Sequence, residues 1–374
     1  MVKRLLAQLE GKNRIGGDLT HPRLLIGSNS KTIATVDFNQ SENTLRLVET
    51  KEVGYRPSWI HHHKSDTVDV LLTNNEADIG RVLVYDITVS GTPFSDFTLD
   101  SLLLRFNEES GGADPCHMSV SLDGKWLFVA NYNGGTVSVR SLKDGKHSHI
   151  LDFQSFGETP HPHMMIMNPF ESSESKRVYV PDLGSDCLHL VQVDSETGMP
   201  SITESLKFTN GSGPRHIAFH PNGSIAYVNL ELSSELAVVS LFPSPIILSV
   251  HSLLPPGITR EAEMQSAAIE LSPDSKFIYL SNRKDPSQND TIVAFKLMDV
   301  EGLVDEGYKP EWTKTDGFFP RGFKISPNGE HLCVGNQETD SLVMFKRGVM
   351  DGKLVKIAEL NLEMGFKPTC VVWV

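Results

Sequence analysis

The sequence predicts an all-β fold, a β-propeller of seven four-stranded blades, and three observations lead to this prediction. A strand, a Pro-Asn-Gly turn and a second strand occupy residues 214–228, and a near-copy occupies residues 320–334. An Asn or Asp closes the second strand in most copies of this unit. Between the copies, apolar and polar residues alternate as they do in a half-buried strand.

The first marker of the repeat is the residue six positions before the proline position of the turn, which we call the anchor. Successive anchors lie 47 to 58 residues apart, near the repeat length of kelch-type propellers. A proline directly precedes every anchor except the fifth. The seven anchors are Ser58, Cys116, His163, Arg215, Ala267, Arg321 and Thr369.

The second marker is the Asn or Asp that ends the strand after the turn. Asn29, Asn74, Asn131, Asp182, Asn282 and Asn336 fit this pattern, and Leu230 occupies the seventh slot. The two series are offset, since Asn29 has no anchor before it and Thr369 has no marker after it. We therefore expect the last strand to complete the first blade, which closes the ring and removes its open edge.

Other segments supply the remaining strands of each blade. Residues 134–142 and 290–297 have the alternating pattern of a third strand, which leads to four strands per blade. We expect residues 1–374 to form a single propeller domain, with residues 1–20 as an N-terminal extension.

Composition excludes several classes of protein. With 34 Lys and Arg against 47 Asp and Glu, the net charge of −13 argues against nucleic acid as a partner. The four cysteines lie far apart without a CxxC pair, so we expect neither a disulfide framework nor a zinc site, and a reducing cytoplasmic location. No apolar run is long enough for a membrane span, and the first residues do not resemble a signal peptide.

Charged residues gather at one end of the predicted ring. Because adjacent strands are antiparallel, anchors at the start of the innermost strands lie at the same face as the residues that follow the second marker. This register brings His163, Arg215 and Arg321 together with Glu231 and Arg283. Three arginines at one mouth favour an anionic ligand, and Glu231 and His163 are the groups available for proton transfer. We expect acid–base chemistry without a metal or cofactor.

The same residues allow a purely structural interpretation. Arginines and glutamates at the ends of blades can pair across neighbouring blades without any catalytic role. In particular, the register leaves open whether Arg321 reaches a ligand or pairs with Glu231.

Two other groups of residues invite a chemical role that the pattern does not favour. Cys116 has His117 beside it, but adjacent strand residues point to opposite faces, so small core packing is the better interpretation. The three consecutive histidines at 61–63 suggest a metal site, yet their register places them near a turn at the end opposite the mouth.

Six motifs along the chain are NYNGGTVSV from Asn131, PHPH from Pro160, VPDLGSD from Val180, GSGPRHIAFHPNG from Gly211, SNR from Ser281 and FPRGFKISPNG from Phe319. Together they lie between residues 131 and 329. They resemble the seven-bladed propeller lactonase family, which includes bacterial 6-phosphogluconolactonases and fungal 3-carboxy-cis,cis-muconate cyclases.

The resemblance implies roles for individual residues. In the cyclase branch the proposed catalytic residues are a His, two Arg and a Glu, which correspond here to His163, Arg215, Arg283 and Glu231. Arg321 lies in a motif shared with the lactonase branch, so the resemblance implies a substrate contact there, with His161 as a further neighbour of the substrate. Lactonase-like relatives read Asn-Glu-Leu in the fifth blade, whereas Leu230 precedes Glu231 here, as in the cyclases.

Three functions remain open on the sequence alone. The leading hypothesis is a cytoplasmic lactonase of carbohydrate metabolism that acts on an anionic sugar lactone such as 6-phosphogluconolactone, with Glu231 or His163 activating water. The second is a carboxymuconate cyclase of aromatic catabolism, which takes a polycarboxylate and closes a lactone. The third is a non-catalytic propeller that binds other molecules over its face.

Overall fold

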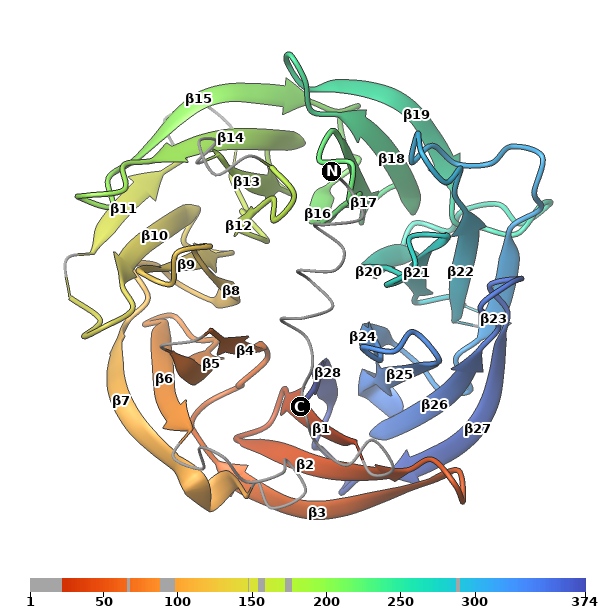
Figure 1. Ribbon diagram of the computed structural model, residues 1–374, viewed down its shortest axis with the longest axis horizontal. Helices are drawn as coiled ribbons and strands as arrows, with labels where there is room; N and C mark the ends of the chain where they lie inside the picture. Colours follow the sequence, from red (N-terminus) through yellow and green to blue (C-terminus); the bar gives the residue numbers. More distant parts are fainter. Residues whose placement is uncertain are drawn as a thin grey trace.

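The computed structural model describes residues 22–65, 68–87, 98–146, 148–153, 159–171, 177–286 and 290–374. Within these ranges, seven antiparallel sheets of four strands stand around a common axis (Figure 1). This is the predicted seven-bladed β-propeller. The predicted N-terminal extension at residues 1–20 lies outside the described residues.

Each blade runs from an innermost strand beside the axis to an outermost strand at the rim (Figure 1). From the axis outward, the first blade is β28 (Pro368–Trp373), β1 (Arg23–Ser28), β2 (Thr32–Asn39) and β3 (Thr44–Glu52). The second is β4 (Ile60–Lys64), β5 (Asp69–Asn75), β6 (Arg81–Ile87) and β7 (Leu102–Glu109), preceded by the 3-10 turn η2 (Leu99–Ser101). The third is β8 (Pro115–Val120), β9 (Trp126–Asn131), β10 (Thr136–Ser141) and β11 (His149–Asp152).

The remaining four blades follow in the same order around the ring. The fourth blade is β12 (Ile166–Met167), β13 (Arg177–Asp182), β14 (Cys187–Val193) and β15 (Pro200–Lys207). The fifth is β16 (Pro214–Phe219), β17 (Ile225–Leu230), β18 (Glu235–Ser240) and β19 (Ile246–Ser252). The sixth is β20 (Gln265–Leu271), β21 (Phe277–Arg283), β22 (Thr291–Lys296) and β23 (Glu311–Lys314). The seventh is β24 (Pro320–Ile325), β25 (His331–Asn336), β26 (Ser341–Arg347) and β27 (Leu354–Asn361), with the 3-10 turn η4 (Gln337–Thr339).

The strands lie where the repeat predicts them. The unit at 214–228 forms β16 and β17 joined by its turn, and β10 and β22 are the predicted third strands. Second strands such as β17 and β25 are buried along their whole length, since neighbouring blades cover both faces of each sheet. Their sequences are therefore continuously apolar rather than alternating.

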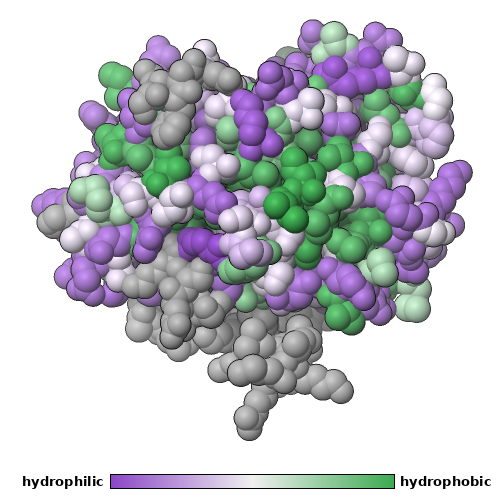
Figure 2. Space-filling model, turned by 90° about the horizontal axis from the view of Figure 1, so that it is seen from above, coloured by the Kyte–Doolittle hydropathy of each residue, from purple (hydrophilic) through white to green (hydrophobic). Residues whose placement is uncertain are grey.

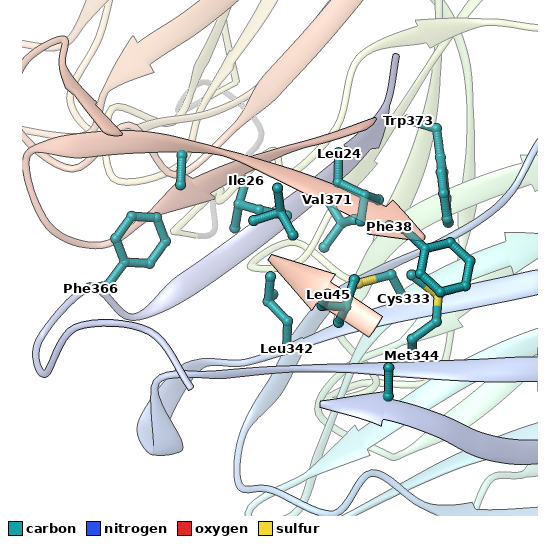
Figure 3. Close-up of a cluster of buried hydrophobic side chains, with 13 residues drawn as sticks. Leu24, Ile26, Phe38, Leu45, Cys333, Leu342, Met344, Phe366, Val371 and Trp373 are labelled. Atoms are coloured by element: carbon teal, nitrogen blue, oxygen red, sulfur yellow. The ribbon is translucent and has the colours of Figure 1, made fainter. Parts of the chain in front are cut away.

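The predicted ring closure is confirmed by the pairing of β28 with β1. Val371 lies opposite Ile26, and the Thr369 hydroxyl donates to the Ser58 carbonyl of the next blade at 2.8 Å. Figure 3 shows the core behind this closure, where Leu24, Ile26, Phe38 and Val371 of the first blade pack against Cys333, Leu342 and Met344 of the seventh. Both ends of the described chain are thus built into one blade.

In the fifth blade an asparagine one residue before the slot of the second marker links this blade to the sixth. Leu230 lies opposite Pro214, as the slot of the second marker requires. The side-chain hydrogen bonds at this point come instead from Asn229, the residue before it. The Asn229 side chain accepts from the His216 amide at 2.7 Å and donates to the Ala267 carbonyl of the sixth blade at 3.0 Å. Leu230 thus occupies the seventh slot, and the asparagine that bonds the sixth blade lies one residue before it.

The rim carries both polar and apolar side chains. Figure 2 views the molecule from the side that is at the top of Figure 1, where β15 and β19 lie. It shows a hydrophobic area among hydrophilic residues. Ile246, Leu248 and Val250 of β19 are exposed on the outermost strand of the fifth blade. No helix within the described ranges has the length and apolar character needed to cross a membrane.

Ring closure makes a prediction about stability. The substitution Val371→Ala leaves a cavity in the core between the first and seventh blades, where Val371 is 3% exposed, and should lower the free energy of unfolding by about 2 kcal/mol. Urea unfolding followed by tryptophan fluorescence measures the change. The matched control is Val355→Ala on the rim strand β27, where the valine is 62% exposed and the midpoint should stay the same. Equal midpoints for both variants would contradict this account of the closure.

Candidate active site at one end of the propeller axis

Backbone irregularities aim the anchor side chains at the axis. Pro214 pairs with Leu230 and His216 with Asn229, so Arg215 is the extra residue of a β-bulge. Cys116, Arg321 and Thr369 are the extra residues of the corresponding pairings in their own blades. A bulge redirects the side chain of its extra residue, and these four anchors all line the axial cavity.

The turn before most anchors has a second common feature. In five blades the residue two positions before the anchor has a left-handed backbone, namely Arg56, Asp114, Gly213, Phe319 and Lys367. Carboxylates hold three of these turns, and in one of them Asp340 accepts from the Lys367 amide at 2.6 Å. Asp186 accepts from the Gly213 amide at 2.8 Å, and Asp290 accepts from the Phe319 amide at 2.7 Å. The chain directly before Arg215 and Arg321 is therefore clamped in place.

Glu231 holds two arginines from adjacent blades. Its carboxylate lies 2.7 Å from Nε of Arg215 and 2.9 Å from Nη2 of Arg283, and all three side chains are buried. Arg215 also donates to the Ala267 carbonyl, and the Arg283 guanidinium lies 4.5 Å from the centre of the Phe319 ring. The structure thus brings together three of the residues that the register placed at the mouth.

This cluster has an excess of positive charge in a dry environment. Burial lowers the pKa of Arg215 to about 10, although Glu231 opposes the shift, and burial also lowers the pKa of Arg283. Arg215 remains protonated at neutral pH at this value. Two guanidinium groups against one carboxylate leave a site that attracts an anion strongly, because there is little water to screen it.

His163 lies beside this cluster as a neutral imidazole. Its backbone amide donates to the Pro181 carbonyl at 2.9 Å, and its ring meets the His216 ring edge to face at 5.0 Å. Burial holds the pKa of His163 well below its usual range, and the charges of Arg215 and Arg321 lower it further. At neutral pH the His163 ring therefore carries no charge.

His161 and Tyr132 form an aromatic wall next to His163. The two rings stack with their centres 4.4 Å apart, and the His161 ring also contacts the Tyr132 carbonyl at 3.0 Å. The Tyr132 ring also meets the His163 ring edge to face, with the two ring centres 5.4 Å apart. Burial raises the pKa of Tyr132 to about 12, so its hydroxyl is protonated over the physiological range.

Arg321 has a different partner from the one that the register allowed. It pairs with Glu76 at 3.3 Å and donates to the Gln337 side chain at 3.3 Å, and Arg56 pairs with the other oxygen of Glu76 at 3.1 Å. Glu231, by contrast, is engaged by Arg215 and Arg283. Arg321 therefore pairs with Glu76 and not with Glu231.

Sequence reasoning missed Arg56, Glu76 and Gln337, although a signal for Glu76 exists. Asn74 accepts from the Trp59 amide as Asn229 accepts from the His216 amide, and a glutamate stands two residues after each asparagine. The sequence prediction placed the mouth-facing residue directly after each marker. After Asn74 that residue is Asn75, whereas Glu76, one position later, is the residue that reaches the mouth.

Neither cysteine nor metal chemistry is supported by the surroundings of the candidate residues. The Cys116 thiol lies 3.7 Å from Nδ1 of His163, and burial raises the pKa of Cys116 far above its usual range. The histidines at 61–63 lie on β4 rather than in a turn, and His62 bonds Asp69 at 2.8 Å. Among the described residues, no three His, Cys, Asp or Glu side chains are grouped to hold a metal ion.

A cavity of about 460 Å³ follows the axis behind the anchors. His163, Arg215 and Arg321 line one end of it, and Pro273, Pro327 and Trp373, at or beyond the far ends of innermost strands, line the other. The candidate site therefore adjoins a partly open axial cavity as well as the open face of the ring.

The thiol environments lead to a second prediction. Burial raises the pKa of Cys370 to about 11 and of Cys333 to about 12, and that of Cys116 still higher, so these thiols should resist alkylation at pH 8. The partly exposed Cys187 should react first. Labelling with iodoacetamide in the native and urea-unfolded states, followed by peptide mass spectrometry, measures the order. Rapid native labelling of Cys116 would restore a thiolate role there.

Fold and site together define a β-propeller with a buried, positively charged site at one end of its axis. The family model described as "Lactonase, 7-bladed beta-propeller" matches residues 19–373. The chain therefore belongs to the seven-bladed β-propeller lactonase family, and this membership identifies it as an enzyme of the lactone hydrolase class.

Individual relatives agree with this assignment. The chain is 33% identical to the 6-phosphogluconolactonase of Formosa agariphila over 70% of this chain and 76% of that protein. It is 30% identical to the 6-phosphogluconolactonase of Bacillus subtilis over 80% of this chain and 82% of that protein. The crystal structure of a periplasmic gluconolactonase from Pseudomonas aeruginosa shares the fold, with a TM-score of 0.80 over 95% of this chain and 99% of that chain, at 23% identity.

Proposed function

We propose that this protein hydrolyses 6-phosphogluconolactone, an anionic sugar lactone, at the site formed by His163, Arg215, Glu231 and Arg283. The observation that carries the proposal is the juxtaposition of a neutral histidine with two arginines held by one buried carboxylate. Lactone hydrolysis needs a proton acceptor for water and positive charge for the oxyanion. Two relatives named 6-phosphogluconolactonase support the choice of substrate.

In the proposed reaction His163 takes a proton from water as the water oxygen attacks the lactone carbonyl carbon. The new bond moves an electron pair onto the carbonyl oxygen, and Arg215 and Arg283 stabilise the oxyanion. When this pair returns, the bond between the carbonyl carbon and the ring oxygen breaks. The protonated His163 then gives its proton to the ring oxygen, and the open-chain aldonic acid releases its carboxyl proton to solvent to become the aldonate.

His163 suits the role of base better than Glu231 does. One oxygen of Glu231 pairs with Arg283 and the other with Arg215, so its electron pairs are already engaged by cations. A carboxylate in that position orients two guanidinium groups toward a common point, which we assign as its role. Tyr132 and His161 provide an apolar wall against which the sugar ring can rest.

The proposal uses side chains alone and needs no metal. A cytoplasmic location also belongs to the proposal, and cell fractionation with an antibody to the chain tests it.

Two substitutions test the assigned roles. His163→Gln removes the base and should lower kcat/KM on 6-phosphogluconolactone by about 10²- to 10⁴-fold. Glu231→Gln loosens both arginines and should lower it by about 10²- to 10³-fold. Rates are measured by proton release with correction for spontaneous hydrolysis, with and without EDTA.

The control is Glu363→Gln, which makes the same chemical change at an exposed position and should leave the rate unchanged. All proteins are also assayed on 3-carboxy-cis,cis-muconate. Turnover of that compound alone would replace the lactonase by the cyclase. Equal activity of wild type and Glu231→Gln on either substrate would remove Glu231 from the site, and inactivity of wild type on both would reject the proposed substrate.

The pH profile tests the base independently. Because His163 must be neutral and burial depresses its pKa, kcat/KM should be constant at neutral pH and fall only as the pH drops through the depressed pKa, well below 6.5. In His163→Gln the residual rate should lose this acidic limb. A limb centred near pH 6.5, or one that persists in the variant, would show that another group is the base.

A further inference from the structure

A second arginine–carboxylate–arginine group stands at the same end of the axis. Glu76 of the second blade pairs with Arg56 at 3.1 Å and with Arg321 of the seventh blade at 3.3 Å. Asn29 fixes Arg56 further by accepting from its Nε at 2.6 Å. Two arginines from different blades thus meet at one carboxylate that is 11% exposed.

The two groups occupy equivalent places in the repeat. Glu76 follows Asn74 by two residues as Glu231 follows Asn229, and both asparagines receive the amide of the residue after the anchor. In each group the glutamate is flanked by two arginines on opposite oxygens. The repeat therefore presents the same chemical device twice around one mouth.

The second group is looser and more accessible than the first. Its ion pairs measure 3.1 and 3.3 Å, against 2.7 and 2.9 Å around Glu231. The Arg56 side chain is 30% exposed and that of Arg321 is 15% exposed, whereas those of Arg215 and Arg283 are 4% and 7% exposed. A guanidinium group held in this way can donate its remaining N–H groups to a ligand while it stays paired with Glu76.

The two groups act on the same space. Arg321 lines the axial cavity together with Arg215 and His163. Its charge also lowers the pKa of His163 and of Arg283, which requires it to be near both. A molecule with one end at His163 therefore has Arg321 within reach of its other end.

We infer that Arg56 and Arg321, positioned by Glu76, bind the phosphate monoester of the substrate while the lactone carbonyl lies between Arg215 and Arg283. This assignment rests on the proposed function and adds a subsite to it. A phosphate monoester is a compact anion of nearly two charges with several acceptor oxygens, which matches two planar forks with only one carboxylate between them. The subsite makes the enzyme selective for phosphorylated lactones over neutral ones.

The test compares 6-phosphogluconolactone with gluconolactone, which differs only in the phosphate. Wild type should prefer the phosphorylated lactone, and Arg56→Ala should reduce this preference, the ratio of the two kcat/KM values, about 10- to 100-fold. Arg56→Lys should recover part of the preference. The matched control, Arg46→Ala, removes the same charge from an arginine that is 69% exposed on the rim strand β3 and should leave the preference unchanged.

A binding measurement separates this inference from the proposed reaction. Inorganic phosphate should raise the melting temperature of wild type and of Arg46→Ala, and this stabilisation should be lost in Arg56→Ala. If wild type hydrolyses neither lactone but binds phosphate in this way, the reaction is wrong and the anion subsite stands. If Arg56→Ala slows both lactones equally, or binds phosphate like wild type, the subsite is wrong and the lactonase stands.

Discussion

The pairing of β28 with β1 is the constraint on which the rest of the molecule depends. A blade covers neither of its own faces, so each sheet is buried only because its neighbours stand against it. An unpaired β1 would leave an open edge beside the core between the first and seventh blades. Closing the ring gives every blade two neighbours and sets the seven innermost strands around one axis. The mouth exists because all of these strands begin at the same face.

The geometry of that mouth comes from small departures from regular β-structure. The bulges at Arg215 and Arg321 insert one residue into the innermost strand and turn its side chain toward the axis. Left-handed residues two places earlier, such as Phe319, reverse the chain just before the bulge. In a strand without bulges, Arg215 and Arg321 would each pair with a residue of the neighbouring strand, and their side chains would not be redirected. The chemistry of the site therefore depends on an irregularity that the repeat preserves.

Burying several arginines together requires carboxylates, and Glu231 and Glu76 meet that requirement. An unpaired guanidinium at this depth would lose its hydration without compensation, and one carboxylate between two arginines offsets much of that cost. Each group of three still keeps an excess of one positive charge. Burial lowers the pKa of His163, the positive charge lowers it further, and the same charge favours an anionic ligand. The ion pairs that stabilise the mouth therefore also give it the charge that the proposed reaction needs.

The sequence by itself determined the number of blades, the closure of the ring and the positions of His163, Arg215, Glu231 and Arg283, because repeats place equivalent residues at equivalent points. It did not determine that the Asn229 side chain links the fifth blade to the sixth, since that hydrogen bond joins residues of two different blades. Only the tertiary structure decided that Arg321 pairs with Glu76, which is 245 residues away, and that His163 is neutral. Both facts depend on distances between blades and on burial, which no local pattern of residues specifies.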